Sequence, residues 1–170
     1  IESDPFGVRN DAALELGLAM AQSIERNLLG NFSSLTGGTV GAAGTVLTWG
    51  HFFAMLTRLR AQNAPLPYKF VCHPYQWHVL GKAVAPGATV TNSDNLQNDI
   101  LQNFYVGSVS GVQIFTSSNI SIDGSADAYC GMFSQPAIAL DWRRAARVEP
   151  ERDASRRGWE LNLSALYAHG

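Results

Sequence analysis

The sequence predicts an α+β fold, in which helices come first along the chain and most strands follow them. Between residues 4 and 65, apolar residues recur at steps of three and four, the spacing of amphipathic helices. Between residues 104 and 170, short apolar runs and alternating patterns are separated by turn residues, which is typical of hairpins and antiparallel strands. Because helices and strands do not alternate regularly, the pattern disfavours an α/β fold.

The composition favours a protein that associates with other copies of itself. Because only 15% of the 170 residues are charged, we expect much of the surface to be buried by contact with other molecules. A net charge of −2 disfavours attraction of the whole surface to nucleic acid or to an anionic membrane. No apolar run approaches the roughly 20 residues of a membrane span, and the N-terminus carries no signal-peptide pattern. Since the sequence begins at Ile1 rather than Met, we expect a processed chain or part of a longer one.

The strongest helical segment covers residues 4–35. Asp4, before Pro5, is one candidate start, and Asn10 or Asp11 is a second. At 1.5 Å per residue the helix is roughly 30–45 Å long, more than a compact domain of this size needs, so we interpret it as a stiff structural rod. Its predicted apolar side comprises Leu14, Gly17, Leu18, Ala21, Ile24, Leu28 and Phe32.

A glycine-rich segment, residues 36–48, follows this helix. It has no lysine, and its glycines do not match a dinucleotide- or phosphate-binding spacing, so we interpret it as a flexible connection. Thr48 is the predicted cap of a second helix that ends before Pro65 and Pro67. The apolar side of that helix comprises Phe52, Met55, Leu56 and Leu59.

The middle of the chain predicts a strand, a helix, a loop and a hairpin in that order. Residues 68–83 predict a short buried strand, a corner at His73-Pro74 and a helix that begins with the proline. The polar, asparagine-rich residues 86–103 predict a loop with about one helical turn. Residues 104–120 predict a hairpin that turns at Ser110-Gly111.

The remaining predicted strands lie near the C-terminus. In the hairpin just described, Val112 and Ile114 are expected on one face. Residues 126–142 predict two apolar strand segments that are broken at Gln135-Pro136. Residues 158–170 alternate as a half-buried antiparallel strand does. The alternation places Trp159, Leu161 and Leu163 on one face and Glu160, Asn162 and Ser164 on the other.

One cluster of residue types is a candidate for catalysis or metal binding: Cys72, His73 and His78, with His51 and Cys130 elsewhere in the chain. A cysteine nucleophile needs a histidine base beside it in space, and a zinc site needs four ligands. His73 and His78 are close in sequence, but no second pair of ligands completes a zinc set. We therefore expect two buried, reduced thiols, no cofactor and no metal. A cysteine or metal enzyme that uses Cys72, His73 and His78 is the less favoured alternative.

Six of the 12 lysines and arginines lie in residues 143–158, which we expect to connect the last two strands as a loop. Between residues 141 and 160, six arginines stand against five carboxylates. Acidic neighbours weaken attraction to phosphate, whereas mixed charges suit contacts between copies of one chain. A solvated charged loop and a nucleic-acid-binding module are the alternatives. The predicted inter-subunit contact residues are Arg143, Arg144, Arg147, Glu149, Glu151, Arg152, Asp153, Arg156 and Arg157.

Taken in order, these segments resemble the major capsid proteins of tailed bacteriophages, which have the Hong Kong 97-like fold. The long helix, the link and "TWGHFFAMLTRLRAQNAPLP" are similar to the family's spine helix and the elements after it. The stretch "YKFVCHPYQWHVLGKA" resembles the family's strand, proline corner and helix. The stretches "YVGSVSGVQIFTSSNI", "AYCGMFSQPAIAL" and the terminal "YAHG" resemble its G-x-x-x-G-x-x-(apolar)-x-x-S element and closing strands.

The resemblance implies a structural, non-enzymatic shell subunit that assembles with itself into the pentamers and hexamers of an icosahedral virion around the genome. It implies a spine helix of the peripheral domain with its link in residues 1–44, a mixed axial domain in residues 45–125 and antiparallel return strands of the peripheral domain in residues 126–170. Assembly in the host cytoplasm, and contacts with decoration, scaffold and portal proteins, are further implications. The resemblance implies only non-specific contact with packaged DNA and no contact with a membrane.

The family also carries an N-terminal arm and an extended loop before the spine helix. The sequence begins without them, so we expect either that the chain is part of a longer one or that these elements are missing. An encapsulin-type compartment shell, which resembles the same fold but encloses an enzyme, is the closest alternative to a phage capsid.

Overall fold

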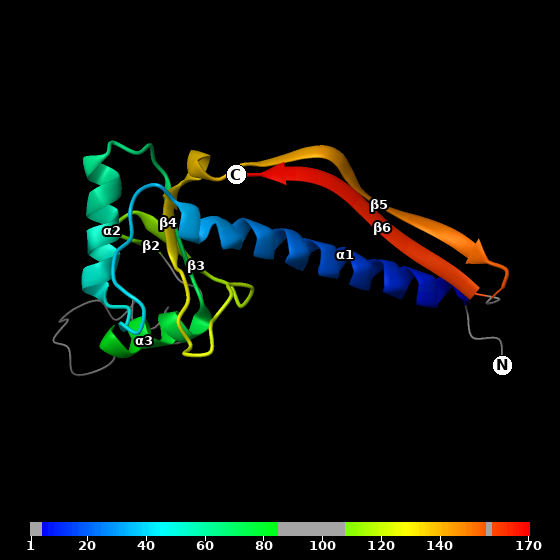
Figure 1. Cartoon of the computed structure of the whole chain (residues 1–170), viewed down its shortest axis with the longest axis horizontal. Helices are drawn as coiled ribbons and strands as arrows, with labels where there is room; N and C mark the ends of the chain where they lie inside the picture. The colour runs from blue at the N-terminus through cyan, green and yellow to red at the C-terminus, as the bar shows by residue number, and fades with distance from the viewer. Residues whose placement is uncertain (1–4, 85–107, 156–157) are drawn as a thin grey trace. The chain divides into compact units, whose positions relative to one another are not determined.

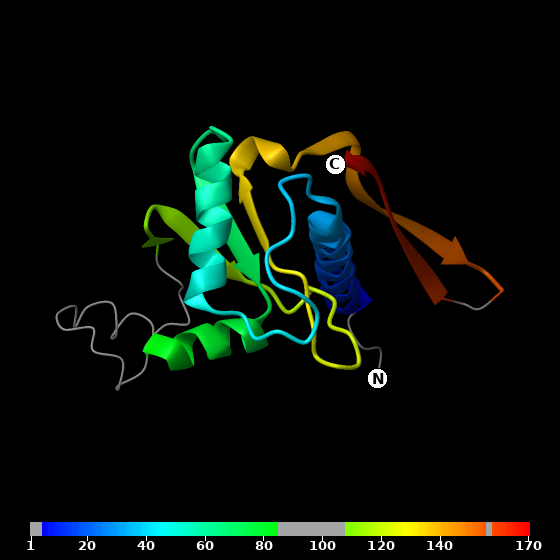
Figure 2. The ribbon, with the colours of Figure 1, turned by 60° about the vertical axis from the view of Figure 1, so that its left-hand side comes forward.

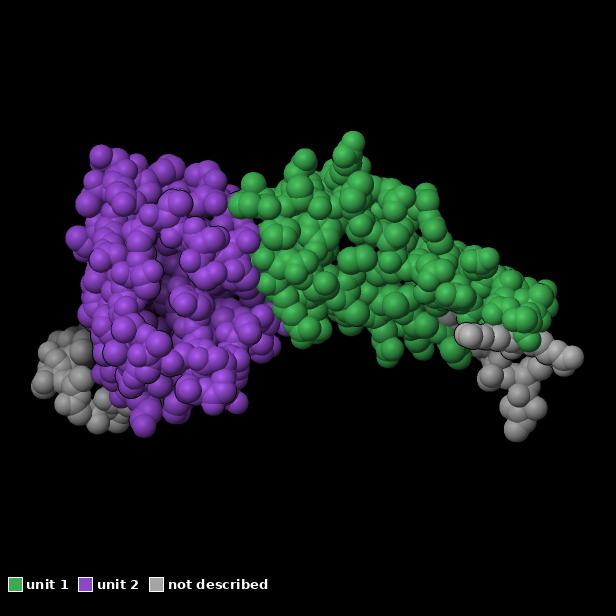
Figure 3. Space-filling view, viewed as in Figure 1, with its two compact units in different colours: residues 1–28, 139–170 green, residues 29–138 purple. Residues whose placement is uncertain are grey.

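The computed structural model describes residues 5–84, 108–155 and 158–170. Its mixture of helices and sheets confirms the α+β prediction. The chain divides into two compact units (Figures 1 and 3). Unit 1 combines residues 1–28 with residues 139–170, and unit 2 comprises residues 29–138. The glycine-rich link therefore belongs to unit 2, as do the residues just before Ala139.

Unit 1 contains a long helix and a two-stranded antiparallel sheet. Helix α1 (Pro5–Gly30), whose last two residues lie in unit 2, confirms the predicted first helix. Strand β5 (Leu140–Asp153) pairs with strand β6 (Gly158–His169). Most of residues 143–158 lie in β5, so the expectation that this stretch is a loop is wrong. A charged run can form this strand because its peptide groups bond to β6 while its side chains remain in solvent.

The predicted apolar side of the first helix is wrong from Leu14 to Ala21 and right from Ile24 to Phe32, where the predicted residues are buried or partly buried. Leu14 and Leu18 are 68% and 67% exposed, whereas Ile24 is buried. Gly17 and Ala21 are exposed as well. The side of α1 that is better covered comprises Ala12, Ala13, Leu16, Met20, Ile24 and Leu28. This helix carries apolar residues around much of its circumference, so periodicity alone could not show which side the same chain covers.

Unit 2 is built on a mixed sheet with the strand order β2-β3-β1-β4. Its strands are β1 (Tyr68–Cys72), β2 (Ser108–Val109), β3 (Val112–Thr116) and β4 (Gly131–Ser134). Strands β2 and β3 form the predicted hairpin, whose turn places Ser110 and Gly111 at φ values of 53° and 81°. Strand β1 lies in the middle, parallel to β3 and antiparallel to β4. The predicted loop at 86–103, and residues 104–107 of the predicted hairpin, lie outside the described residues.

Two helices of unit 2 begin where the sequence predicts. Helix α2 (Trp49–Ala61) starts with a capping box, in which Thr48 Oγ1 accepts a hydrogen bond from His51 N (3.3 Å) and His51 Nδ1 accepts one from Thr48 N (3.4 Å). Helix α3 (Pro74–Val84) begins at the predicted proline. Trp49 Nε1 of α2 donates to Leu80 O of α3 (3.2 Å). Short 3-10 turns form at Asn31–Ser34 (η1) and at Gln135–Ala137 (η2), the predicted strand break.

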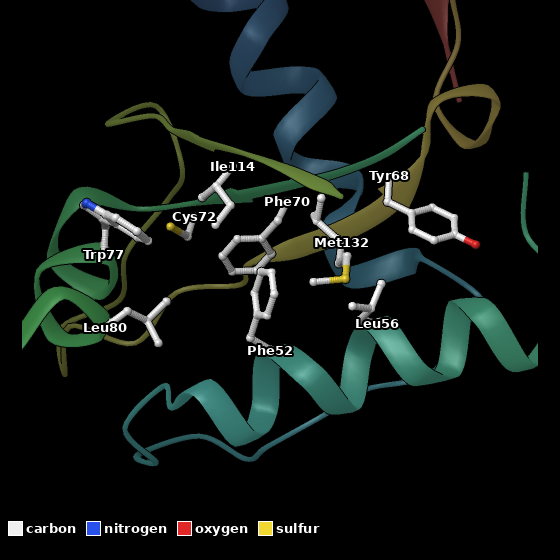
Figure 4. Packing of buried hydrophobic residues seen from close by; sticks show 10 residues of the cluster. Phe52, Leu56, Tyr68, Phe70, Cys72, Trp77, Leu80, Ile114 and Met132 are labelled. Atoms are coloured by element: carbon white, nitrogen blue, oxygen red, sulfur yellow. The ribbon is translucent and has the colours of Figure 1, made fainter. Parts of the chain in front are cut away.

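The core of unit 2 lies between α2 and one face of the sheet (Figures 2 and 4). Phe52 and Leu56 point from α2 toward Phe70 and Met132, as Figure 4 shows. The rings of Phe52 and Phe70 meet edge to face with centroids 5.3 Å apart. Burying each such ring contributes about 1.5–3 kcal/mol. The buried cluster comprises Phe52, Leu56, Tyr68, Phe70, Cys72, Trp77, Leu80, Val112, Ile114 and Met132.

Candidate functional site

Unit 1 leaves most of its large apolar side chains exposed. Among its described residues, one hydrophobic side chain is buried, that of Ile24, and the buried cluster described above lies wholly in unit 2. Ordering a unit of this size costs much conformational entropy, which so little burial does not offset. The exposed set comprises Val8, Leu14, Leu18, Leu140, Trp142, Val148, Trp159 and Leu166. Large exposed apolar patches are typical of surfaces that other molecules cover.

Between the pairs Val148–Leu163 and Glu151–Glu160, the β5–β6 hairpin has one face with apolar pairs and one face with polar pairs. Successive strand residues alternate between faces, so the facing pairs Val148–Leu163 and Pro150–Leu161 share one face. Tyr167 lies on the same face of β6, and its hydroxyl accepts a hydrogen bond from Asn27 Nδ2 of α1 (2.6 Å). The opposite face carries the polar pairs Glu149–Asn162 and Glu151–Glu160.

Charges on the hairpin are mixed and nearly balanced. Its described residues hold four arginines against five carboxylates, which gives little net attraction for a phosphate backbone. Within the described residues the ion pair formed is Arg147 with Glu149, and Arg144 Nη2 donates to Ser164 Oγ (3.3 Å). Glu151 and Glu160 face each other directly across the two strands. Like charges in that position destabilise a sheet unless a cation approaches them.

The predicted contact residues lie along one strand rather than in a loop. Arg143, Arg144, Arg147, Glu149, Glu151 and Arg152 are exposed residues of β5. Asp153 ends β5, and its Oδ1 accepts hydrogen bonds from Ser155 N (2.8 Å) and Ser155 Oγ (2.6 Å). Arg156 and Arg157 lie outside the described residues. Trp142 and Leu166 of the same hairpin are 44% and 49% exposed, and no sequence pattern had marked them as contact residues.

The structure places the cysteine and histidine candidates in different surroundings. His73 is buried and its Nδ1 accepts a hydrogen bond from Tyr75 N (3.2 Å), whereas His78 is exposed on α3. Cys72 shares a side-chain hydrogen bond with Cys130, and that bond together with burial holds the pKa of the Cys72 thiol far above its usual range. A thiol that stays protonated is a poor nucleophile.

The described residues contain no group of three or more His, Cys, Asp or Glu side chains that could hold a metal ion. Both cysteines are free thiols, as expected, but only Cys72 is fully buried; Cys130 is partly exposed. Their proximity was missed because 57 intervening positions separate them in the sequence and each was considered alone.

Unit 2 also contains a groove of about 820 Å³, lined by the glycine-rich link, α2 and residues 128–134. Two contacts fasten the link beside it: Asp127 Oδ2 accepts from Gly44 N (2.8 Å), and Arg58 Nη1 donates to Thr39 O (2.9 Å). Figure 2 shows the link running through unit 2 to the start of α2. The lining includes Cys130, so the groove gives access to that thiol.

None of the described helices is both long enough and apolar enough to cross a membrane. A family model described as phage capsid protein matches residues 1–170. No curated protein and no solved structure gives a significant match.

Proposed function

The chain belongs to the phage capsid protein family, and from that premise we propose that it self-assembles into the pentamers and hexamers of an icosahedral shell that encloses the genome. A structural role in the phage capsid, and a place in the virion, follow from the family. The Hong Kong 97-like fold, the arrangement of copies and assembly in the host cytoplasm are part of the proposal.

The small core of unit 1 is the observation that carries this proposal. With Ile24 as the buried hydrophobic residue among its described positions, unit 1 needs apolar cover from elsewhere. In a shell, neighbouring copies of the same chain supply that cover, because each copy presents and receives the same surfaces. The proposed contacts bury Leu14 and Leu18 of α1, and Trp142 and Leu166 of the hairpin.

We assign the peripheral domain of the subunit to unit 1 and the axial domain to unit 2. This assignment places the boundaries at residues 28 and 138 instead of at the 44 and 125 expected from sequence. The charged residues of β5 then lie in the peripheral domain. The proposed inter-subunit contacts are those expected from sequence: Arg143, Arg144, Arg147, Glu149, Glu151, Arg152, Asp153, Arg156 and Arg157.

The facing pair Glu151 and Glu160 is the sharpest of these proposed contacts. Each carboxylate weakens the hairpin of the isolated chain by repelling the other. An arginine from a neighbouring copy, placed between them, converts that repulsion into two charge-assisted hydrogen bonds. The nearly balanced charge of the described hairpin supports at most non-specific contact with packaged DNA. Decoration, scaffold and portal proteins are further proposed partners.

Assembly of the purified full-length gene product tests the proposal. We expect negative-stain electron microscopy and sedimentation to show closed shells with five- and six-fold clusters. A stable monomer at every concentration tested would contradict self-assembly. Native particles that contain a cargo enzyme instead of a genome would identify a compartment shell, which is the alternative from sequence.

Replacing Glu151 by Gln tests the contact between copies separately from the stability of the single chain. Because the substitution relieves repulsion, we expect the isolated chain to be as stable as the wild type or more stable. Because it removes a carboxylate that receives a neighbour's arginine, we expect the concentration needed for assembly to rise about tenfold, the equivalent of about 1.4 kcal/mol. Lys82→Gln, at an exposed position of α3 in unit 2, is the control that also removes one surface charge. Unchanged assembly by Glu151→Gln would contradict this contact.

A further inference from the structure

We propose that Cys72 and Cys130 are a redox-responsive pair, which stays as two thiols in a reducing environment and closes to a disulfide in an oxidising one. Both are free cysteines in this structure. The pair lies within unit 2, at the end of β1 and just before β4.

The two cysteines come directly after the last pair of the β1–β4 ladder. Val71 of β1 faces Gly131 of β4 in that antiparallel ladder, and continuing the register by one step would set Cys72 opposite Cys130. Gln135 N donates to Pro67 O (3.1 Å), which makes 67 and 135 a hydrogen-bonded pair. Pairs alternate along an antiparallel ladder, so positions 72 and 130 are of the non-hydrogen-bonded kind. Cα atoms in such pairs are roughly 4.5 Å apart, within the range that a disulfide spans.

The side chains of the two cysteines meet. They share a hydrogen bond, and Cys130 Sγ also donates to Gln76 Oε1 (2.7 Å). Gln76 is held in place because its Nε2 donates to Ala128 O (2.8 Å) and its Oε1 accepts from His73 N (3.2 Å). The sulfurs are therefore positioned by the sheet on one side and by Gln76 of α3 on the other.

Burial gives the two thiols different roles. Cys72 is fully buried, and the pKa of its thiol is raised by its bond to Cys130 and by burial. Cys130 is partly exposed and lines the groove of unit 2, so a small molecule can reach it. Cys130 is thus the thiol that reacts first with an external reagent, and Cys72 is the buried thiol that then attacks the Cys130 sulfur.

The oxidant that fits this arrangement is a small-molecule disulfide. The Cys130 thiolate attacks one of its sulfurs, forming a mixed disulfide and releasing one small thiol. The mixed disulfide removes the Cys130 thiol, whose hydrogen bond is the main cause of the raised Cys72 pKa. The Cys72 sulfur then attacks the Cys130 sulfur, which forms the Cys72–Cys130 bond, and the Cys72 proton leaves with the second small thiol. The protein loses two hydrogens, and the oxidant gains them as two thiols. The Gln76 Oε1 atom keeps its hydrogen bond from His73 N when the Cys130 donor is lost.

Closure would join β1 to β4 across a loop of roughly 60 residues, so it should stabilise unit 2 by restricting the unfolded chain. We expect the melting temperature to rise on the order of 10 °C. The bond itself does not depend on the proposed function. The time at which the bond forms does depend on the proposed function, because a shell assembled inside a reducing cell would form this bond after release into oxidising surroundings.

The test exposes the purified full-length chain, with its thiols reduced, to oxidised glutathione, and then labels free thiols after unfolding. We expect both labels to disappear together, the intact mass to fall by two hydrogens, and a digest to contain one peptide that links Cys72 to Cys130. Cys130→Ser keeps a donor for Gln76, and in that variant Cys72 should remain fully labelled and the melting temperature unchanged by the oxidant.

Three results would overturn the proposal: glutathione that remains on Cys130 as a stable mixed disulfide, two thiols that stay free in the folded chain, or a linked peptide that forms only when the chain is unfolded in urea. All are read on the wild-type chain, so none depends on a variant that folds. They are also independent of whether shells form, so failure of assembly and failure of the thiol pair are separate outcomes.

Discussion

Gly131 of β4 occupies a place where the fold has no room for a side chain. A Cβ atom added there would lie 2.7 Å from Cδ1, 2.8 Å from Cε1 and 2.9 Å from Cγ of Phe32. Phe32 is buried in η1, and its ring lies 5.8 Å from that of Phe133. Because the close contacts include Cγ, near the base of the side chain, a small rotation at the end of the ring cannot relieve them. Gly131→Ala therefore forces η1 and β4 apart.

The expected cost follows from these distances. Overpacking a filled site costs about 1–3 kcal/mol, and replacing a strand glycine by alanine returns about 0.5–1 kcal/mol of backbone entropy. The net loss for Gly131→Ala is then up to about 2.5 kcal/mol, with a midpoint of about 1 kcal/mol, which lowers the melting temperature of a unit of this size by roughly 5 °C. Urea titration of the full-length chain, followed by tryptophan fluorescence, measures it, because Trp77 is buried in the same unit.

A double-mutant cycle isolates the cause. Phe32→Ala removes the ring and costs about 3–5 kcal/mol by itself. In that background Gly131→Ala meets no ring, so we expect it to be neutral or slightly stabilising, and the two changes to be non-additive. If Gly131→Ala is neutral in the wild type, or if its cost is the same with and without the ring of Phe32, then this ring does not exclude a side chain at position 131.

Three further predictions concern unit 2. Thr48→Ala should destabilise the chain by about 0.5–2 kcal/mol through loss of the α2 cap, while Thr48→Ser should retain most of the stability; equal losses in urea titrations would contradict the capping role. Phe52→Ala should cost about 3–5 kcal/mol, whereas the same change at exposed Phe53 should cost less than half as much, again by urea titration. Folding raises the pKa of Cys72, so above about pH 8.5 the unfolded thiol ionises while the folded one keeps its proton. The free energy of unfolding should therefore fall as the pH rises past that value. In a pH series, an equal fall in the free energy of unfolding of the reduced wild type and of Cys72→Ala would contradict this.

Local chemistry was enough to predict most of unit 2. The cap at Thr48, the proline start of α3, the turn at Ser110-Gly111 and the break at Gln135-Pro136 all form as the sequence indicates. Each depends on backbone preferences of a few adjacent residues, which a single sequence records directly. The parallel pairing of β1 with β3 depends instead on contacts distant in sequence, and no local pattern specifies it.

The sequence was a poorer guide to unit 1. Leu14 and Leu18 repeat at helical spacing, which predicts a buried side, yet both are exposed in this chain. The arginines suggested a loop, yet Arg143 to Arg152 belong to a strand. Both errors have one physical cause. An apolar or charged pattern indicates which side chains need a partner, but it does not show whether that partner belongs to the same chain. The facing cysteines were missed because pairing across strands is a tertiary property.

A density map of the assembled particle would show directly whether other copies of this chain cover unit 1. We expect Leu14 and Leu18 of α1, and Trp142 of β5, to lie within contact distance of neighbouring subunits, with an arginine of a neighbour between Glu151 and Glu160. A shell in which these side chains remain open to solvent would contradict this expectation.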